Sequence, residues 1–449
     1  MPSFLDKLLK ILQSRRGKDM HFLCRHLLSQ RGEASQTALA QEIVNTYGAM
    51  DSGQRTRFFD MLCREFSPDP KALQRAAANY LENPMEQNRI LLSFAAEPPR
   101  QELFRRINTA PRGTETLVAI RKDLLPLAAK SPELSALDAD LRHLFRSWFN
   151  RGFLGLRSIN WKTPAYILEK LIGYESVHEI NGWPDLRRRL QADRRCFAFF
   201  HPALVDEPII FVEVALANEL IGNLERLLDL NAPVLASDKV NTAIFYSINN
   251  CLDGLRGIPF GNFLIKQVVV ELAAEFPNMK NFCTLSPLPG FSHALMERDN
   301  PEGFTLRRLA ALLADYGPAL TKTAKRRDVV ESFFALLEQP VVYREQLAAP
   351  LSRLAFAYLM KARQNGKVAD SVAAFHLSNG ARVERINAFG NLRPYGLKAS
   401  FGITVNYRYI PEELEDNHER FVAGGQIQAA SALLREHETV AQAWQPDSK

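Results

Sequence analysis

A serine held at a proline-rich corner has a setting that could support chemistry. An expected strand over residues 281–285 delivers Ser286 onto the sequence Pro-Leu-Pro-Gly, whose prolines restrict the backbone. A serine so placed can be a nucleophile, a hydrogen-bond donor to a carbonyl, or a plain cap of the strand end. The G-x-S-x-G elbow is absent, which disfavours a standard serine hydrolase.

His376 is the second residue of this kind. Residues 372–377 are expected to form an apolar strand, which places His376 at its end, before the turn-forming Asn379-Gly380. Histidine titrates near neutrality and can give a proton to carbon or oxygen, although a half-buried structural histidine fits the pattern equally well. None of the histidines has H-E-x-x-H or comparable spacing, so we expect no metal site.

A glycine-spaced turn lies just upstream of Ser286. It connects an expected strand, 243–248, to an apolar expected helix, 262–276, with Pro259 just before or inside the first helical turn. The glycines of this turn are Gly254, Gly257 and Gly261. Glycine lets a ligand approach the backbone, and the unpaired N–H groups of a helix N-terminus attract anions. The turn therefore suits a pyrophosphate, while a connection without any ligand also fits it. Neither G-x-G-x-x-G nor G-x-x-x-x-G-K-[ST] is present, which argues against a Rossmann site and a P-loop.

Two further groups of polar side chains are weaker candidates. His201 and Glu207 lie in a short connection between strands, where Glu207 can orient a histidine, hold water, or serve as a turn carboxylate. Tyr407 and Tyr409 alternate with Arg408 in an expected strand, so both tyrosines face the same side. Such tyrosines can line a pocket, or they can be half-buried without a function.

Length and composition bound the class of protein. The 449 residues are enough for two domains or three small ones. The net charge of +6 fits a small anionic ligand, and no basic-aromatic stripe favours nucleic acid. The five cysteines form no C-x-x-C pair, which argues against disulfides and cysteine-bound metal and favours a reducing cytoplasm. Because no apolar run reaches the roughly 20 residues that a bilayer requires, we read the amphipathic stretch 4–12 as a docking helix.

The spacing of apolar residues along the chain predicts two domains that would hold the candidate residues in place. Residues 1–155 carry apolar side chains at helical spacing, interrupted by prolines, which predicts a helical bundle. Residues 156–449 have an α+β pattern, in which a helical insertion at about 296–365 interrupts a core of strands. The expected strands are 195–200, 208–216, 243–248, 281–285, 372–377, 382–389 and 404–409. Residues 426–444 are expected to form a surface helix.

Several separated segments together resemble the malonyl-CoA decarboxylase family, and they keep their order over roughly residues 157–410. The segments are Trp161-Lys-Thr-Pro-Ala-Tyr-Ile-Leu-Glu-Lys170, Val177-His178 with Trp183, Arg194-Arg-Cys196, His201 through Pro208, Phe245-Tyr-Ser-Ile248, Gly254-Leu-Arg-Gly-Ile-Pro-Phe-Gly261, Phe263-Leu-Ile-Lys266, Leu285-Ser-Pro-Leu-Pro-Gly-Phe291, Phe375-His-Leu-Ser-Asn-Gly380 and Asn406-Tyr-Arg-Tyr409. This combination is far more specific than any single motif.

The resemblance implies a helical domain, 1–155, that mediates oligomerisation, and a catalytic domain, 156–449, with a GNAT-like acyl-CoA-binding fold. The family's catalytic serine and histidine map onto Ser286 and His376, and a functional lysine maps onto Lys170. Its substrate-binding residues map onto Arg256, Gly257, Ile258, Pro259, Phe260, Gly261 and Asn262, together with Ser286 and His376. One departure is visible, since the family often has an acidic residue where this chain has Pro259. The resemblance also implies a homo-oligomer, a dimer or tetramer, with no nucleic-acid or membrane partner.

The implied reaction converts malonyl-CoA to acetyl-CoA and CO2 through an enolate that is then protonated at the α-carbon. We expect His376 to donate that proton and Ser286 to orient the malonyl group and accept a proton beside His376, with Glu207 and Tyr409 as supports. The thioester itself is the electron sink, so no metal or other cofactor is expected. An acyltransferase of the GNAT type that uses acetyl-CoA is the alternative, and a coenzyme-A-binding sensor or scaffold is a third interpretation.

Overall fold

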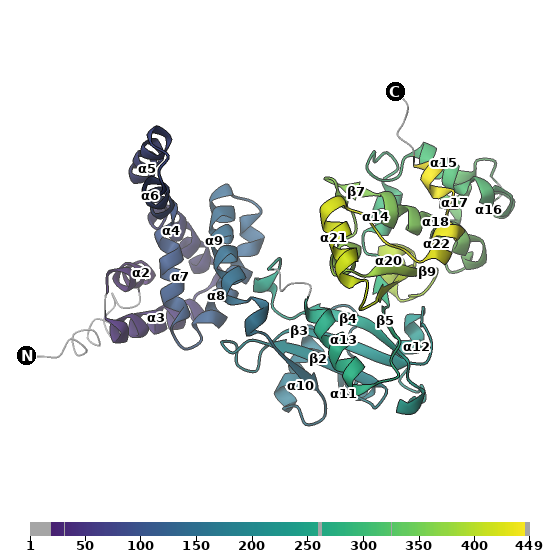
Figure 1. The fold of residues 1–449 in the computed structure, drawn as a ribbon, viewed down its shortest axis with the longest axis horizontal. Helices are drawn as coiled ribbons and strands as arrows, with labels where there is room; N and C mark the ends of the chain where they lie inside the picture. Colours follow the sequence, from purple (N-terminus) through teal and green to yellow (C-terminus); the bar gives the residue numbers. More distant parts are fainter. Residues whose placement is uncertain (1–18, 31, 259–262, 325, 445–449) are drawn as a thin grey trace, which may run out of the picture. The chain divides into compact units, whose positions relative to one another are not determined.

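The computed structural model of the chain describes residues 19–30, 32–258, 263–324 and 326–444. The chain, drawn as a ribbon in Figure 1, divides into two compact units. The first contains Met1–Leu156, Phe199–Ile210 and Asn250–Gly261, and the second contains Arg157–Ala198, Phe211–Asn249 and Asn262–Lys449. None of the helices in the described ranges combines the length and the apolar character that crossing a bilayer requires.

The first unit is helical, as the sequence predicts. Its helices are α2 (Met20–Ser29), α3 (Glu33–Gly48), α4 (Ser52–Glu65), α5 (Pro70–Glu82), α6 (Glu86–Ala96), α7 (Pro99–Asn108), α8 (Gly113–Ala128) and α9 (Pro132–Trp148). Polar caps begin several of them, and Asp51 forms a capping box with Gln54 at the start of α4. Phe59, Phe104 and Phe145 are fully buried in the core of this unit. The docking helix expected at residues 4–12 lies outside the described residues.

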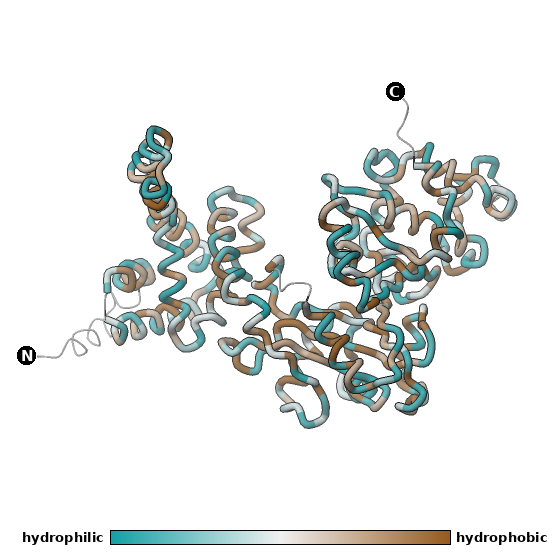
Figure 2. The backbone as a smooth tube through the Cα atoms, in the orientation of Figure 1, coloured by the Kyte–Doolittle hydropathy of each residue, from teal (hydrophilic) through white to brown (hydrophobic). Residues whose placement is uncertain are grey.

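A mixed sheet forms most of the strand structure. Its strands are β1 (Gly155–Ile159), β2 (Arg194–Phe200), β3 (Pro208–Ala217), β4 (Thr242–Asn250), β5 (Asn281–Thr284), β6 (Ser286–Pro287), β9 (Arg382–Asn387) and β10 (Thr404–Tyr409). Their order is β1-β2-β3-β4-β5-β10-β6, and β9 also pairs with β10. The apolar run of β3 is buried along its whole length, as its β-branched sequence predicts. The brown stretches in the region of the sheet in Figure 2 mark such hydrophobic residues.

The central strands part in the middle of this sheet. β4 and β5 are parallel and pair from Thr242 to Phe245 on β4, and β4 then continues to Asn250 without β5. β5 also pairs antiparallel with β10, and β6 continues this pairing, with Val405 opposite Ser286. A parallel pair that parts in this way, beside an antiparallel β10, gives the GNAT-like α+β arrangement that the sequence analysis predicts.

Helices surround this sheet and fill the predicted insertion. Those before the insertion are α10 (Ala165–Tyr174), α11 (Gly182–Arg189), α12 (Leu224–Leu228) and α13 (Phe263–Glu275). The insertion contains α14 (Phe291–Met296), α15 (Leu306–Leu313), α16 (Gly317–Ala324), α17 (Val329–Leu337) and α18 (Arg344–Lys361), followed by the short pair β7 (Arg363–Gln364) and β8 (Lys367–Val368). After it come α19 (Ser371–Ser378), α20 (Pro394–Ser400), α21 (Leu414–Gly424), α22 (Ser431–Glu436) and α23 (Val440–Ala443).

Two sequence predictions of local structure are wrong. Residues 372–377 form helix α19 rather than a strand, because Asp370 caps the helix by accepting hydrogen bonds from the N–H groups of Val372 and Ala373. A short apolar run does not by itself distinguish the two conformations. Residues 426–444 do not form one helix, because the segment first pairs with β9, where Ala430 N–H donates to the Val383 carbonyl oxygen, and only then forms α22 and α23.

Candidate active site

Ser286 and His376 meet in the interior of the second unit. Ser286 is the first residue of β6, and His376 lies in the last turn of α19, 90 residues later in the sequence. The Ser286 Oγ and the His376 Nε2 are 2.9 Å apart, and both residues are at least 95 % buried, with 5 % and 2 % of their surface exposed. The structure therefore brings together the two residues that the sequence analysis singles out first.

Strand β10 supplies the aromatic surroundings of His376. Tyr409 places its hydroxyl 2.7 Å from the His376 Nδ1, and the ring of Tyr407 stacks on the imidazole with the two ring centres 4.7 Å apart. Both tyrosines are buried, whereas Arg408 between them makes ion-pair contact with Glu384, so the predicted alternation of this strand is confirmed. Tyr409 thus joins Ser286 and His376 in one hydrogen-bonded chain.

Thr284 extends this chain, and the sequence analysis missed it. The Oγ1 of Thr284 lies 2.9 Å from the Ser286 Oγ, and the backbone N–H of Tyr407 donates to the same Oγ1 at 3.1 Å. Thr284 and Ser286 are two residues apart, which is the spacing of side chains on one face of extended backbone. This two-residue spacing is the only sequence feature that links Thr284 to Ser286. Threonine is common in strands, so the spacing alone does not indicate a functional residue.

The surroundings of His376 are apolar enough to keep its ring neutral. Burial lowers the pKa of His376 to about 3, and it raises the pKa of Tyr409 well above its usual range. At neutral pH the chain of Thr284, Ser286, His376 and Tyr409 therefore carries no formal charge. A neutral imidazole has one ring N–H and one ring acceptor, so it can pass a proton between two hydrogen-bond partners.

The predicted coenzyme A loop is described only in part. Arg256, Gly257 and Ile258 belong to the first unit, whereas Pro259, Phe260, Gly261 and Asn262 lie outside the described residues. Gly257 has a φ of +74°, a conformation that glycine adopts without strain. The Arg256 side chain is largely exposed and forms an ion pair with Asp253 at 2.8 Å.

A buried arginine fixes the beginning of this loop. Arg121 of α8 is 1 % exposed, pairs with Asp138, and donates to the carbonyl oxygens of Gly254 and Arg256 at 2.6 and 2.9 Å. Gly254 itself packs closely on α8, because a Cβ there would lie 2.0 Å from the Val118 carbonyl oxygen. Close packing therefore accounts for Gly254, and no motif in the sequence connects Arg121 with the loop.

The remaining candidates lie elsewhere. Lys170 is half-buried on α10, and Glu207 is half-buried in the connection between β2 and β3, in the first unit. Neither belongs to the described partners of Ser286 and His376. His201 uses both ring nitrogens locally, with Nε2 at 3.0 Å from the Trp148 carbonyl oxygen and Nδ1 accepting the N–H of Ala203. These contacts favour a structural role for His201.

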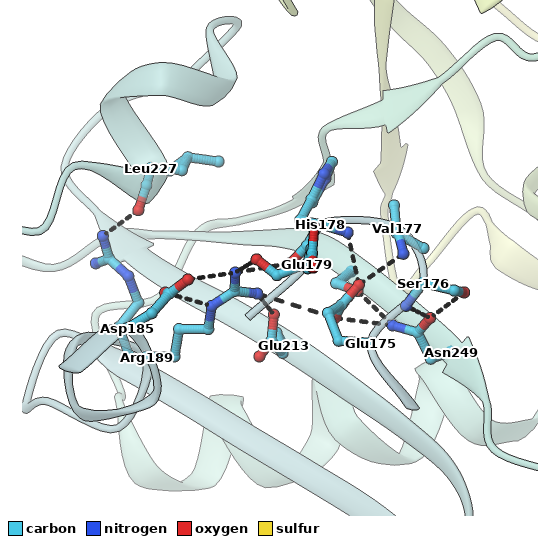
Figure 3. A network of polar contacts seen from close by, with 12 residues as sticks. Glu175, Ser176, Val177, His178, Glu179, Asp185, Arg189, Glu213, Leu227 and Asn249 are labelled. Carbon is cyan, nitrogen blue, oxygen red and sulfur yellow. Dashed lines mark hydrogen bonds and ion pairs between the residues drawn. The ribbon is translucent and has the colours of Figure 1, made fainter. Parts of the chain in front are cut away.

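A second buried polar cluster ties β3 and β4 to the connection between α10 and α11 (Figure 3). Glu175 accepts hydrogen bonds from Ser247 at 2.6 Å and Asn249 at 2.9 Å, so it holds the part of β4 that extends beyond β5. Arg189 donates to Asp185 at 2.9 Å and to Glu213 at 2.7 Å. We call this set the Glu175–Arg189 network; its members are Glu175, Asp185, Arg189, Glu213, Ser247 and Asn249.

The parting of β4 and β5 gives a fold of the GNAT-like α+β class, with a buried serine–histidine pair beside the point where the strands part. Within that class, residues 152–447 match the malonyl-CoA decarboxylase C-terminal domain, and residues 66–149 match the malonyl-CoA decarboxylase N-terminal domain. The chain belongs to the malonyl-CoA decarboxylase family, which confirms the resemblance seen in the sequence.

Individual relatives agree with this assignment. The mitochondrial malonyl-CoA decarboxylase of Anser anser anser is 32% identical over 416 residues, covering 88% of this chain and 82% of the relative, and that of Rattus norvegicus is 31% identical over 427 residues, covering 91% and 87%. Among solved structures, the malonyl-CoA decarboxylase from Rhodopseudomonas palustris has a TM-score of 0.82 and 43% identity, covering 97% of this chain and 100% of the other. The enzyme from Agrobacterium vitis has a TM-score of 0.83 and 43% identity, covering 93% and 99%.

Proposed function

We propose that this chain is a carboxy-lyase that converts malonyl-CoA to acetyl-CoA and CO2. The observation that carries the proposal is the buried chain from Ser286 through His376 to Tyr409, which begins where β4 and β5 part. Membership in a family of decarboxylases supports the substrate, and the partly described loop at Arg256, Gly257 and Ile258 supports the binding of a pyrophosphate.

Decarboxylation requires stabilisation of the negative charge on the enolate and one proton for the α-carbon. Loss of CO2 leaves an enolate of the thioester, so a hydrogen-bond donor at the thioester oxygen lowers the barrier, typically by about 3–4 kcal/mol. In this proposal Ser286 orients the acyl group and exchanges a proton with His376; the contact between the Ser286 Oγ and the His376 Nε2, at 2.9 Å, supports this role. The α-carbon takes up one proton in each turnover, with His376 as the proton source and solvent restoring it afterwards. The thioester accepts the electron pair, so no metal or organic cofactor enters the proposal.

A direct assay tests this function. Purified protein is incubated with malonyl-CoA without any added cofactor, and CO2 and acetyl-CoA are measured together. We expect equal amounts of the two products. Folded protein that releases no CO2, but consumes acetyl-CoA when an amine is added, would instead be an acyltransferase. Binding of coenzyme A without turnover of either thioester would leave a sensor or scaffold.

We also propose that the chain is a homo-oligomer that assembles through its helical unit. Helices α5 and α6 pack against each other (Figure 1). Neither helix has a buried residue, and large apolar side chains are exposed on and between them. These side chains are Leu81, Ile90, Leu91 and Phe94, together with Met85 at the N-cap of α6. Apolar surface of this kind marks interaction sites. Sedimentation of the wild type and of Phe94→Asp tests the proposal, because a single monomeric species for both would contradict it.

Roles for two further residues and a cellular location are also proposed. Lys170 and Glu207 are proposed as supports for substrate binding, although they lie outside the Ser286–His376 chain. A cytoplasmic location is proposed from the five free cysteines, while two relatives are described as mitochondrial. Fractionation of the source cells decides between these compartments.

A further inference from the structure

One buried carboxylate connects the two segments that carry Ser286 and His376. Asp370 is 1 % exposed and lies immediately before α19, the helix whose last turn contains His376. Its Oδ1 accepts hydrogen bonds from two N–H groups in the first turn of α19, at 3.0 and 2.9 Å. Its Oδ2 accepts a hydrogen bond from the N–H of Gly290 at 3.0 Å, 80 residues earlier in the chain. The two oxygens of one side chain thus bind two separate segments.

The segment on the Gly290 side is short, stiff and closely packed. Pro287 and Pro289 restrict the backbone that leads from Ser286 to Gly290. Gly290 has an ordinary φ of −85°, but a Cβ there would lie 2.4 Å from the Oη of Tyr358, which is buried. Lack of space therefore accounts for this glycine, and a displacement of Gly290 would be transmitted to Ser286.

Capping of α19 alone does not require the second contact. A single side-chain oxygen, such as that of serine or threonine, can cap a helix. At Asp370 both oxygens accept N–H groups, and within the part of the chain that the structure describes the carboxylate has no further hydrogen bond and no ion pair. A buried carboxylate is costly unless hydrogen bonds satisfy it, so its stabilisation depends on both segments keeping their places.

We propose that Asp370 is a positioning residue, which sets the distance between Ser286 and His376 by holding the Pro-Leu-Pro-Gly corner with one oxygen and α19 with the other. Ser286 lies four residues before Gly290, and His376 lies six residues after Asp370. The 2.9 Å contact between the Ser286 Oγ and the His376 Nε2 joins the two segments that this carboxylate holds. The inference rests on the proposed function only for the substrate used in its kinetic test.

Kinetics of Asp370→Asn provide the first test. Asparagine caps helices about as well as aspartate, but its amide has only one oxygen, so either α19 or Gly290 loses its acceptor. We expect kcat for malonyl-CoA to fall at least about tenfold, the worth of one hydrogen bond to a charged group, with little change in KM. Asp328→Asn is the matched control and should keep wild-type kcat, because among the described residues the Asp328 carboxylate bonds only to the N–H of Glu331 within its own helix, α17.

Gly290→Ala tests the same connection from its other end and leaves Asp370 unchanged. The new Cβ would collide with the Tyr358 Oη, so we expect the corner to move and kcat to fall. Tyr358→Phe in the same chain removes the colliding oxygen and should restore kcat to within about threefold of the single Tyr358→Phe variant. A folded Gly290→Ala variant with wild-type kcat would contradict the proposal.

Crystal structures of the variants make the test independent of turnover. In Asp370→Asn we expect the Ser286 Oγ and the His376 Nε2 to lie beyond hydrogen-bond distance, whereas Asp328→Asn should keep their contact. A folded Asp370→Asn variant that keeps this contact, or that keeps wild-type kcat, overturns the proposal. Because the distance between the two atoms does not depend on turnover, a wild type that is inactive on malonyl-CoA overturns the proposed function and leaves this inference to be decided by the crystal structures.

Discussion

Two buried polar networks in the second unit differ in charge. The chain of Thr284, Ser286, His376 and Tyr409 consists of hydroxyls and a neutral imidazole, whereas the Glu175–Arg189 network contains ion pairs. Hydroxyl and imidazole protons can be redirected by rotation or tautomerism, but a buried ion pair holds its partners in one geometry. We therefore propose that the neutral chain carries the chemistry and that the charged network holds the strands in place.

The largest expected effect separates the two networks by activity. Replacing His376 or Ser286 by Ala removes a group from the neutral chain, and we expect kcat for malonyl-CoA to fall by about 10²- to 10⁴-fold. Release of ¹⁴CO2 measures it, and thermal unfolding shows whether each variant is folded. A folded variant that keeps more than about a tenth of wild-type kcat would remove that residue from the proposed chemistry.

Arg189 provides the corresponding test of the charged network. Arg189→Met leaves the Asp185 carboxylate without its cation and the Glu213 carboxyl group without its hydrogen-bond donor, so we expect the free energy of unfolding to fall by about 3–5 kcal/mol. Urea unfolding measures this loss. Arg226→Met is the matched control, because its ion pair with Glu219 is exposed and is expected to contribute about 0–1 kcal/mol. Equal losses in the two variants would contradict a scaffolding role for Arg189.

The charged network should also make stability depend on pH. Burial raises the pKa of Glu213 to about 8, above the usual value of about 4.3 for a glutamate. Between these values the folded protein binds a proton that the unfolded chain does not, so this site lowers the free energy of unfolding as pH rises. Glu213→Gln stays neutral and should remove this contribution, which is at most about 1.4 kcal/mol per pH unit. Urea unfolding between pH 5 and 8 that shows identical slopes for both proteins would count against it.

The smallest expected effect distinguishes the two tyrosines beside His376. Tyr409→Phe removes the hydroxyl that contacts the His376 Nδ1, and we expect kcat to fall about tenfold. Tyr407→Phe is the matched control, because within the described residues the Tyr407 hydroxyl has no hydrogen-bond partner while its ring stacks on His376. Steady-state kinetics that show equal losses in both variants would mean that ring packing, not the hydroxyl, is what matters.

Sequence reasoning predicted the parts of the fold that depend on local pattern. The β-branched run of β3 and the alternating residues of β10 place those strands within a residue of their observed ends. The conformation of residues 372–377 could not be predicted in this way, since the Asp370 cap competes with an apolar run that suits either structure.

Residues that act through tertiary contacts carried no signal in the sequence. Ser286 and His376 were predicted from local setting and family resemblance, whereas Thr284 contacts the amide of Tyr407, which is more than a hundred residues away. Arg121 contacts the loop at Gly254 from a helix far upstream, and Glu175 contacts Ser247 in the same way. No periodicity or motif links such pairs, because the fold alone brings them together.

The charge state of His376 tests the difference between the two networks most directly. NMR of ¹⁵N-labelled histidine across pH 5 to 8, assigned with His376→Ala, follows the protonation of this ring. Because burial lowers the pKa of His376 to about 3, we expect its ring signals to stay those of a neutral imidazole throughout this range. A titration with a midpoint near the ordinary value of about 6.5 would show a charged imidazole in the chain and would contradict the neutral chain proposed here.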